Sequence, residues 1–294
     1  MSKKCLFIFN PYSGRAAIKN HVADIVDIIV KAGYETEVYP TQGREDATKK
    51  VGESEGKYDH IVASGGDGTL NEVISGMMKL KKRPTLGYIP MGSTNDFANS
   101  LNISSDVLEA AETAVNGSDY NIDIGIFNKR PFVYIAAFGA FTEVSYSTSQ
   151  DLKNFLGHQA YLLEGIKQLA KIREYKATFD LDGEIIEGGF LYAMITNATS
   201  AGGFKGITGK DVSLNDGVYE VMLVKKFSDI GDLNDVISVL TGLKKDAPGV
   251  IKRKASRVKV YSTEDISWTI DGEYAGSYKD VEISIENCAV SIKS

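Results

Sequence analysis

The chain has 294 residues, of which 33 are Lys or Arg and 39 are Asp or Glu, so its formal net charge is −6. A hydrophobic fraction of 43% and a charged fraction of 24% are ordinary for a protein with a buried core. This composition excludes a largely disordered chain and a collagen-like fibre, and the acidic total argues against a dedicated nucleic-acid binder. The two cysteines, Cys5 and Cys288, lie at opposite ends of the sequence. That spacing argues against a disulfide framework or a zinc site and favours a reducing compartment.

No apolar run approaches the roughly 18 residues that cross a bilayer. The apolar run over residues 5–9 ends at Asn10-Pro11, which is too early for a secretory signal peptide. We therefore expect a soluble, cytoplasmic protein without a transmembrane segment.

The first third of the chain alternates between predicted strands and helices. Strands are expected over residues 5–9, 35–39, 61–63 and 85–89, and helices over about 18–29, 45–53 and 70–80. This alternation predicts an α/β domain with a layered, mostly parallel sheet.

From about Asn121 onward the predicted elements are mostly strands. They cover residues 132–137, 177–181, 184–186, 190–196, 219–224, 257–261 and 267–270, with a tight hairpin at Asp182-Gly183. Helices are expected at about 159–172 and 232–243. This pattern predicts a β-rich, antiparallel, sandwich-like domain. We place the domains at residues 1–122 and 123–294, and the C-terminal tail could pack back on the first domain.

A glycine-rich turn, Gly65-Gly66-Asp67-Gly68-Thr69, lies between a predicted strand and a predicted helix. Glycines leave backbone amides uncovered, and a helix N-terminus favours an anion, so this turn suits a phosphate. Because Asp67 would repel a phosphate, its presence implies an intervening Mg²⁺ or a proton-transfer role. An ordinary turn in which Asp67 caps the helix explains the motif equally well.

Two further loops follow strands at the same sheet edge, where ligands of parallel sheets bind. They are residues 10–15, with Asn10, Ser13 and Arg15, and residues 90–97, with Asn95 and Asp96. In the C-terminal half, Asp271-Gly272-Glu273 and Asn215-Asp216-Gly217 follow the same turn-forming pattern. Each alone is compatible with a plain turn.

Three of these segments together resemble the diacylglycerol kinase catalytic-domain family. They are Asn-Pro-x-Ser-Gly at residues 10–14, Gly-Gly-Asp-Gly-Thr-Leu-Asn-Glu at 65–72 and Pro-x-Gly-x-x-Asn-Asp-Phe-Ala at 90–98. The glycine motif alone is shared with NAD kinases, whereas the other two make the resemblance specific to lipid kinases, above all the soluble bacterial ones. Ser93 stands where the family usually has Thr, and Arg15 where Lys is common; both keep the chemical character of the site.

The resemblance implies roles for particular residues. Glu273 would be the general base, Asp271 its partner and the second candidate, and Asp67 and Asp96 would organise metal and water around the phosphates. A structural Mg²⁺ would be held by the Asp216 carboxylate with the carbonyls of Ser213 and Val218. ATP would bind to residues in four segments: Asn10, Pro11, Tyr12, Ser13, Gly14, Thr41, Gly66, Asp67, Gly68, Thr69, Leu70, Asn71, Glu72 and Ser93.

The implied function is phosphorylation of the free hydroxyl of diacylglycerol to phosphatidic acid, a step of phospholipid biosynthesis that uses ATP and Mg²⁺. The enzyme would meet this lipid at the membrane surface as a peripheral protein. Another lipid alcohol (a sphingoid base or phosphatidylglycerol), NAD, or a binding-only regulator remain alternatives. A homodimer also stays open. The basic segments 79–83 and 252–259 are solvated faces or contacts for anionic headgroups.

Overall fold

The computed structural model describes residues 2–93, 95–139, 173–198, 200–201, 204–205, 212–226, 235–236, 238–239 and 244–294. The predicted helix over 159–172 lies outside these residues. Of the one predicted over 232–243, only residues 235, 236, 238 and 239 are described, and they are helical. Within the described residues, no helix is both long and apolar enough to cross a membrane.

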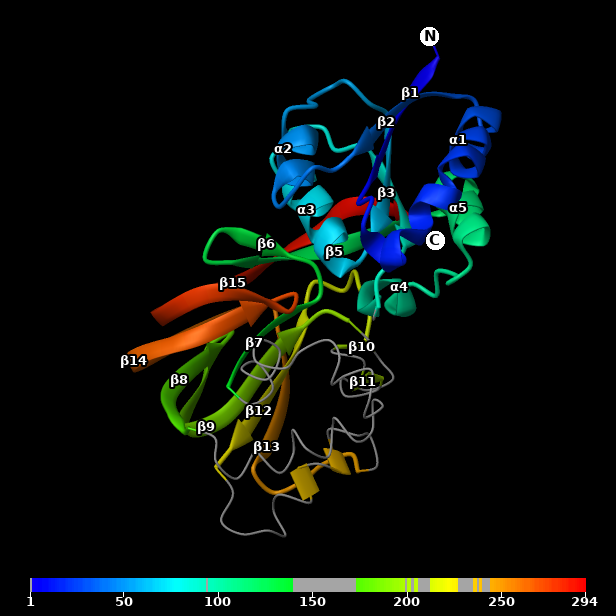
Figure 1. Cartoon of the computed structure of the whole chain (residues 1–294). Helices are drawn as coiled ribbons and strands as arrows, with labels where there is room; N and C mark the ends of the chain where they lie inside the picture. The colour runs from blue at the N-terminus through cyan, green and yellow to red at the C-terminus, as the bar shows by residue number, and fades with distance from the viewer. Residues whose placement is uncertain are drawn as a thin grey trace.

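Four strands of the N-terminal half pair in parallel, in the order β4-β3-β1-β2. Their carboxyl ends therefore lie along one edge, and the loops that follow them meet there (Figure 1). The strands are β1 (Lys3–Phe9), β2 (Tyr34–Pro40), β3 (His60–Gly65) and β4 (Thr85–Pro90).

Helices cover both faces of these strands because successive side chains of a strand point to opposite sides. Leu6 and Ile8 of β1 face one cluster, and Cys5 and Phe7 face the other. Both faces must therefore be apolar, which explains the unbroken apolar run of β1. On the first side lie α2 (Asp46–Gly52) and α3 (Asp67–Met77); on the second lie η1 (Ser13–Asn20), α1 (Val22–Lys31) and α5 (Val107–Asn116).

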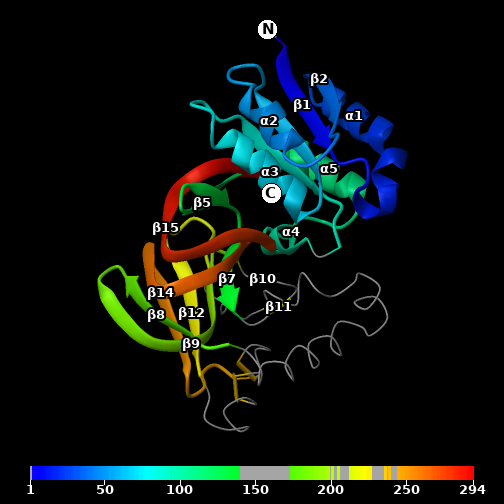
Figure 2. The same cartoon turned by 60° about the vertical axis from the view of Figure 1, so that its left-hand side comes forward.

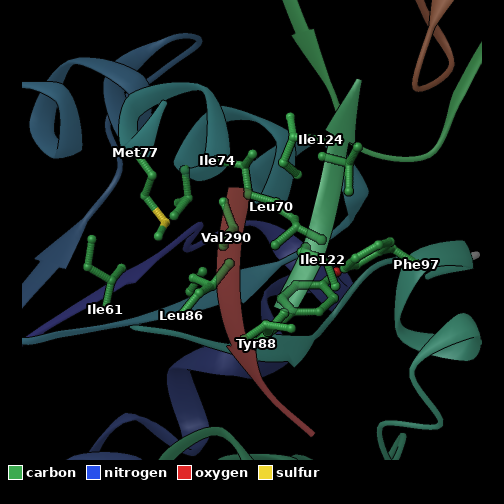
Figure 3. Packing of buried hydrophobic residues seen from close by; sticks show 14 of the residues in the cluster. Ile61, Leu70, Ile74, Met77, Leu86, Tyr88, Phe97, Ile122, Ile124 and Val290 are labelled. Carbon is green, nitrogen blue, oxygen red and sulfur yellow. The ribbon is translucent and has the colours of Figure 1, made fainter. Parts of the chain in front are cut away.

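The helix that begins at the glycine turn is fixed by its apolar stripe. Leu70, Ile74 and Met77 recur at helical spacing on α3 and pack against Ile61 and Leu86 of the sheet (Figure 3). The same figure shows residues of two further strands, β5 (Asp119–Phe127) and β15 (Glu273–Lys293), joining this cluster. The position of the turn above α3 therefore depends on both halves of the chain.

The C-terminal half is antiparallel and sandwich-like. The long strands β9 and β14 each pair with β8 at one end and with β7 at the other, so the sheet folds over its own core around Trp268. The strands are β5 (Asp119–Phe127), β6 (Arg130–Phe132), β7 (Ile135–Gly139), β8 (Tyr175–Leu181), β9 (Glu184–Thr196), β10 (Ser200–Ala201), β11 (Phe204–Lys205), β12 (Tyr219–Lys225), β13 (Val250–Ala255), β14 (Arg257–Ile270) and β15 (Glu273–Lys293).

The two halves are joined by β15. This strand pairs with β14 and β5, and at its far end Ile292 lies parallel to Leu86 of β4. Ser118 and Ser294 then exchange two backbone hydrogen bonds of 3.0 Å. The described strands other than β10 and β11 thus form one continuous sheet, and Figure 2 shows β15 running from the lower half into the upper one.

Three local differences from the sequence-based expectations bear on the site. The expected strand 132–137 is two strands, because the amides of Val133 to Ile135 bind the Asp271 carboxylate. The helix α3 begins at Asp67 rather than Leu70, so the glycine turn is its first turn. The short helix α4 (Asp96–Ser100), which was not expected, places Asp96 beside that turn.

Candidate active site

The loops after β1 to β4 line a cleft of about 840 Å³ at the carboxyl edge of the parallel strands. A cavity of this size suits a nucleotide, since small-molecule sites usually occupy about 300–1,000 Å³. The opposite wall is contributed by Glu273, at the start of β15. Residues of four loops and α3 make up the rest of the lining: Asn10, Tyr12, Ser13, Gly14, Thr41, Gln42, Gly43, Arg44, Gly66, Gly68, Thr69, Glu72, Met91, Gly92 and Ser93.

The floor of the cleft is the contact between the glycine turn and the loop after β4. A Cβ on Gly92 would lie 2.7 Å from the Cα of Gly66, so only glycine allows this approach. Gly66 is the N-cap of α3, and no side chain caps the helix. The structure therefore does not use Asp67 as a helix cap. The uncapped first turn presents its positive end to the cleft, as an anion site requires.

Asp67 is a half-buried residue whose carboxylate lies in an unfavourable environment. Burial and the charge of Asp96 raise its pKa to about 6, although the backbone amides of Phe97 and Asp96 donate to it. Its Oδ1 atom is buried and has no hydrogen-bond partner among the described residues. Asp96 is itself buried, with 2% of its surface exposed. A cation between these two carboxylates would relieve both the burial and the repulsion.

Asp271 has a different role, since its two oxygens are fully engaged. Its Oδ1 accepts the amides of Tyr134 and Ile135 at 2.9 and 3.1 Å, and its Oδ2 accepts the amide of Val133 at 2.6 Å. Asn71 of α3 also donates to Oδ2, at 2.5 Å. Burial raises the pKa of Asp271, and these four donors act in the opposite direction. The carboxylate therefore anchors a turn and connects it to the first domain.

Glu273 is exposed and faces the cleft. It directly follows a two-residue turn in which both Asp271 (φ 48°) and Gly272 (φ 79°) have positive φ, as in the tight hairpins that prefer Asp-Gly. The plain-turn interpretation is thus correct for the backbone, and the same turn aims Glu273 at the glycine floor. Its Oε1 lies 3.8 Å from the position of a Cβ on Gly68, and its Oε2 accepts from Arg44 at 2.8 Å.

Four of the predicted nucleotide residues do not line the cleft. Leu70 is a core residue of α3 and Asn71 binds Asp271, while Pro11 and Asp67 are not among the lining residues. Glu72 does reach the cleft, but its carboxylate also accepts the amides of Glu45 and Ala47, at 2.8 and 3.3 Å. Glu72 therefore holds the N-terminus of α2 and the loop before it.

The predicted metal turn lies in the other half of the chain and is not part of the cleft lining. Asp216 is exposed, and Lys254 Nζ lies 3.5 Å from its Oδ2. The turn is docked on the buried carboxylate of Asp123, which accepts the amide of Gly217 at 2.8 Å. The oxygen donors expected for Mg²⁺, the carboxylate and the two backbone carbonyls, are thus on one ordered turn.

Comparisons with known proteins agree with this arrangement. A sequence profile described as "Diacylglycerol kinase catalytic domain" matches residues 4–127, and one described as "YegS C-terminal NAD kinase beta sandwich-like domain" matches residues 137–292. A "Diacylglycerol kinase" of Bacillus subtilis (strain 168) is 40% identical over 276 residues, which cover 93% of this chain and 91% of that one. The chain belongs to the diacylglycerol kinase catalytic-domain family.

Other relatives fit the same assignment. A "Diacylglycerol kinase" of Staphylococcus carnosus (strain TM300) is 35% identical over 278 residues, 94% of this chain and 90% of that one. A crystal structure of a diacylglycerol kinase from Bacillus anthracis str. Sterne has a TM-score of 0.85 at 25% identity and covers 100% of this chain and 97% of that one. The chain is therefore a kinase of the lipid-kinase type, with ATP as the phosphoryl donor that this family implies.

Sequence reasoning did not find Arg44 or the roles of Asn71 and Glu72 as supports. Arg44 lies in the loop after β2, which ends at the same edge as the other phosphate loops. The position of Arg44 after a predicted parallel strand could have indicated a site residue, but no sequence motif marks it. The contacts of Asn71 and Glu72 join segments that are far apart in sequence, so no local pattern reveals them.

The raised pKa of Asp67 predicts a stability effect with a definite sign. Because its folded pKa of about 6 exceeds the ordinary 3.8, the ionised carboxylate destabilises the fold above about pH 6, and this cost is lost as the pH falls toward 4. Asp67→Asn should therefore stabilise the ligand-free protein by about 1–3 kcal/mol at pH 7.5, and by much less at pH 4.5. Urea unfolding at both pH values measures this. Asp265→Asn, at an exposed position, is the control; an equal change in both variants would contradict the prediction.

A second prediction separates Asp271 from Glu273. An Asn at position 271 would direct its NH₂ group at two donors, so Asp271→Asn should lower the free energy of unfolding by about 2–3 kcal/mol. Glu273→Gln, at an exposed position, should change it by less than about 0.5 kcal/mol. Thermal and urea unfolding at pH 7.5 measure both. Equal stability of the two variants would show that Asp271 is not a structural anchor.

Proposed function

We propose that the protein is an ATP-dependent diacylglycerol kinase that transfers the γ-phosphoryl group to the free hydroxyl of diacylglycerol and releases phosphatidic acid. The observation that carries this proposal is Glu273 facing the uncapped glycine turn across one cleft. A phosphoryl transfer to an alcohol needs an anion site and a proton acceptor on opposite sides of the reacting phosphorus. The names of the curated relatives support the choice of lipid.

The nucleotide would lie on the first domain. Its phosphates would rest on the first turn of α3, beside the loops that carry Ser13 and Ser93, where backbone amides and hydroxyls can donate. Its remaining part would extend toward Tyr12 and Thr41 along the same lining. Asn71 and Leu70 would contribute by holding α3 rather than by touching the nucleotide, because their side chains are used elsewhere.

In the reaction, the lipid hydroxyl oxygen forms a bond with the γ-phosphorus while the bond from that phosphorus to the β,γ-bridging oxygen breaks. The hydroxyl proton passes to Glu273, and ADP leaves with the electron pair of the broken bond. Glu273 suits this role because it is exposed and one of its oxygens is directed at the glycine turn. Asp271 does not, because four donors occupy its oxygens.

Asp67, with Asp96 beside it, fits a role in holding Mg²⁺. The buried, unpartnered Oδ1 of Asp67 is the fitting observation. Among the described residues, no three His, Cys, Asp or Glu side chains form a metal cluster, so this ion would take its other ligands from phosphate and water, as Mg²⁺ commonly does. When bound, Mg²⁺ neutralises the charge that develops on the phosphates.

The turn with Ser213, Asp216 and Val218 would hold a second, structural Mg²⁺. Its donors are hard oxygens, but Lys254 already places an ammonium 3.5 Å from Asp216 and 3.1 Å from the buried Glu220. A divalent ion there would have to lengthen the Lys254–Asp216 contact. It would stabilise the turn and takes no part in the chemistry.

The lipid would be met at the membrane surface. Of the basic segment 252–259, Arg253 pairs with Glu184 and Arg257 with Glu282. Together with the pairing of Lys254, these contacts favour a solvated face over a headgroup site for that segment. The segment 79–83 keeps the alternative open. Among the described residues, Arg83, which pairs with Glu286, is its only basic side chain in an ion pair.

The acceptor can be tested directly. Radiolabelled ATP is offered with mixed micelles of diacylglycerol, with phosphatidylglycerol, with a sphingoid base and with NAD, each at the same concentration. We expect labelled phosphatidic acid and at least about 10-fold less product from the others, since a pocket built for one hydroxyl rejects poorly matched acceptors. Preferred transfer to another acceptor would replace the proposed substrate. Nucleotide binding without any transfer would indicate a regulator.

The proposed base predicts a separation of catalysis from binding. Glu273→Gln should lower kcat by roughly 10²- to 10⁴-fold, because Gln cannot accept the proton, while the Kd for ATP stays nearly unchanged. Initial rates with diacylglycerol and calorimetric ATP titrations measure the two quantities. A variant with near-normal kcat would remove Glu273 from the reaction.

A further inference from the structure

Arg44 is the charged side chain that meets Glu273 across the cleft. It lies in the loop after β2, in the first domain, and its Nη2 is 2.8 Å from Glu273 Oε2 in the second. Both residues line the cleft, and both side chains are more than half exposed. An exposed ion pair of this kind contributes little to the free energy of unfolding. Its main effect is on the orientation of the two side chains.

The loop that carries Arg44 is held on both sides. The carboxylate of Glu72 accepts the amides of Glu45 and Ala47 directly after it. Before it, Asp46 accepts the amide of Gln42 at 2.7 Å and the Tyr39 hydroxyl at 3.1 Å. Arg44 therefore projects from a fixed backbone at the edge of the cleft.

The Glu273 side chain, in contrast, is free to rotate. The Asp271 anchor fixes the turn before it, but the Glu273 side chain has three rotatable bonds and is exposed. A proton acceptor must lie within hydrogen-bond distance of the hydroxyl, and a free Glu side chain spends much of its time in other rotamers. Arg44 takes one oxygen, Oε2, and so leaves Oε1 on the side of Gly68.

We propose that Arg44 is a positioning residue for phosphoryl transfer, which holds the Glu273 carboxylate so that its free oxygen is directed at the phosphate floor. This inference rests on the proposed function of Glu273. The competing role for an arginine in this cleft is to bind the nucleotide phosphates directly. The two roles differ in what they change: orienting the base affects kcat, whereas binding phosphate affects the Kd for ATP.

The kinetic test uses Arg44→Met and Arg44→Lys. We expect Arg44→Met to lower kcat roughly 10- to 100-fold, the size of effect that a misplaced catalytic group produces, with the KM and Kd for ATP changed less than about 3-fold. Arg44→Lys, which keeps a charge but not the planar fork, should recover part of the loss. Arg253→Met is the matched control, because it removes another exposed Arg–Glu pair, at 2.9 Å from Glu184 and outside the cleft lining.

Non-additivity provides the second criterion. In a Glu273→Gln background, Arg44→Met should cause no further loss of kcat, because the group that it orients is already gone. A 10-fold or larger rise in the Kd for ATP, or losses that multiply in the double variant, would overturn the proposal and assign Arg44 to the nucleotide.

A spectroscopic test does not depend on turnover. In protein labelled with ¹³C at the Glu carboxyl carbon, the resonance that disappears in Glu273→Gln identifies Glu273. We expect it to shift in Arg44→Met and to stay in place in Arg253→Met. If the wild type phosphorylates no lipid, the proposed function fails, yet this spectrum still decides whether Arg44 holds Glu273. An unchanged resonance in Arg44→Met overturns the inference.

Discussion

The geometry of the cleft depends on the buried carboxylate of Asp271. It accepts hydrogen bonds from three successive backbone amides, those of Val133 to Ile135 at the junction of β6 and β7, and from the side chain of Asn71 on α3. Removing the Asp271 carboxylate would leave these buried donors unpaired. The free-energy cost of an unpaired buried donor exceeds the net stabilisation from a single hydrogen bond. Through these contacts the helix under the phosphate floor, the break between two strands and the turn before Glu273 have fixed relative positions. Asp271, which resembles a second catalytic acid in the sequence, is thus the residue whose contacts position Glu273.

The site combines two kinds of carboxylate in different environments: Glu273 lines the cleft, whereas Asp67 and Asp96 are not among its lining residues. Asp96 is buried and Asp67 is half-buried beside it, and both burial and the charge of Asp96 raise the pKa of Asp67. Carboxylates with such raised pKa values cluster at functional sites, where a bound cation and phosphates offset the repulsion between them. Glu273 is exposed and paired with an arginine, so it can change partners without disturbing the core. Asp67 and Asp96 therefore suit the binding of a neutralising cation, and Glu273 suits proton transfer.

The sequence predicts the N-terminal half well, because its signals are local. The apolar strand runs, the helical spacing on α1 and α3 and the glycine turn each follow from neighbouring residues. The prediction is weaker for the second half: β14 and β15 are single long strands with register shifts, and 21 residues of β15 carry no continuous alternation. The site was predicted as a set of loops at one edge. Which acid faces the cleft was predicted only through the family resemblance, which named Glu273 as the base and Asp271 as the second candidate. The residues alone do not separate them, since Asp271 and Glu273 differ through contacts to residues more than a hundred positions away.

The path of β15 restricts how this enzyme can work. Glu273 begins the strand, and its other end pairs with β4 and Ser118 in the first domain. A hinge that carried Glu273 away from the glycine turn would have to bend or break the ladder between β15 and β5, which pairs on both sides of an irregularity between Glu286 and Val290. Domain closure, which brings the catalytic groups of many kinases together, is therefore an unfavourable route here. Glu273 and the phosphate floor already lie together in the structure, and the exposed side chains of Glu273 and Arg44 pair at the cleft.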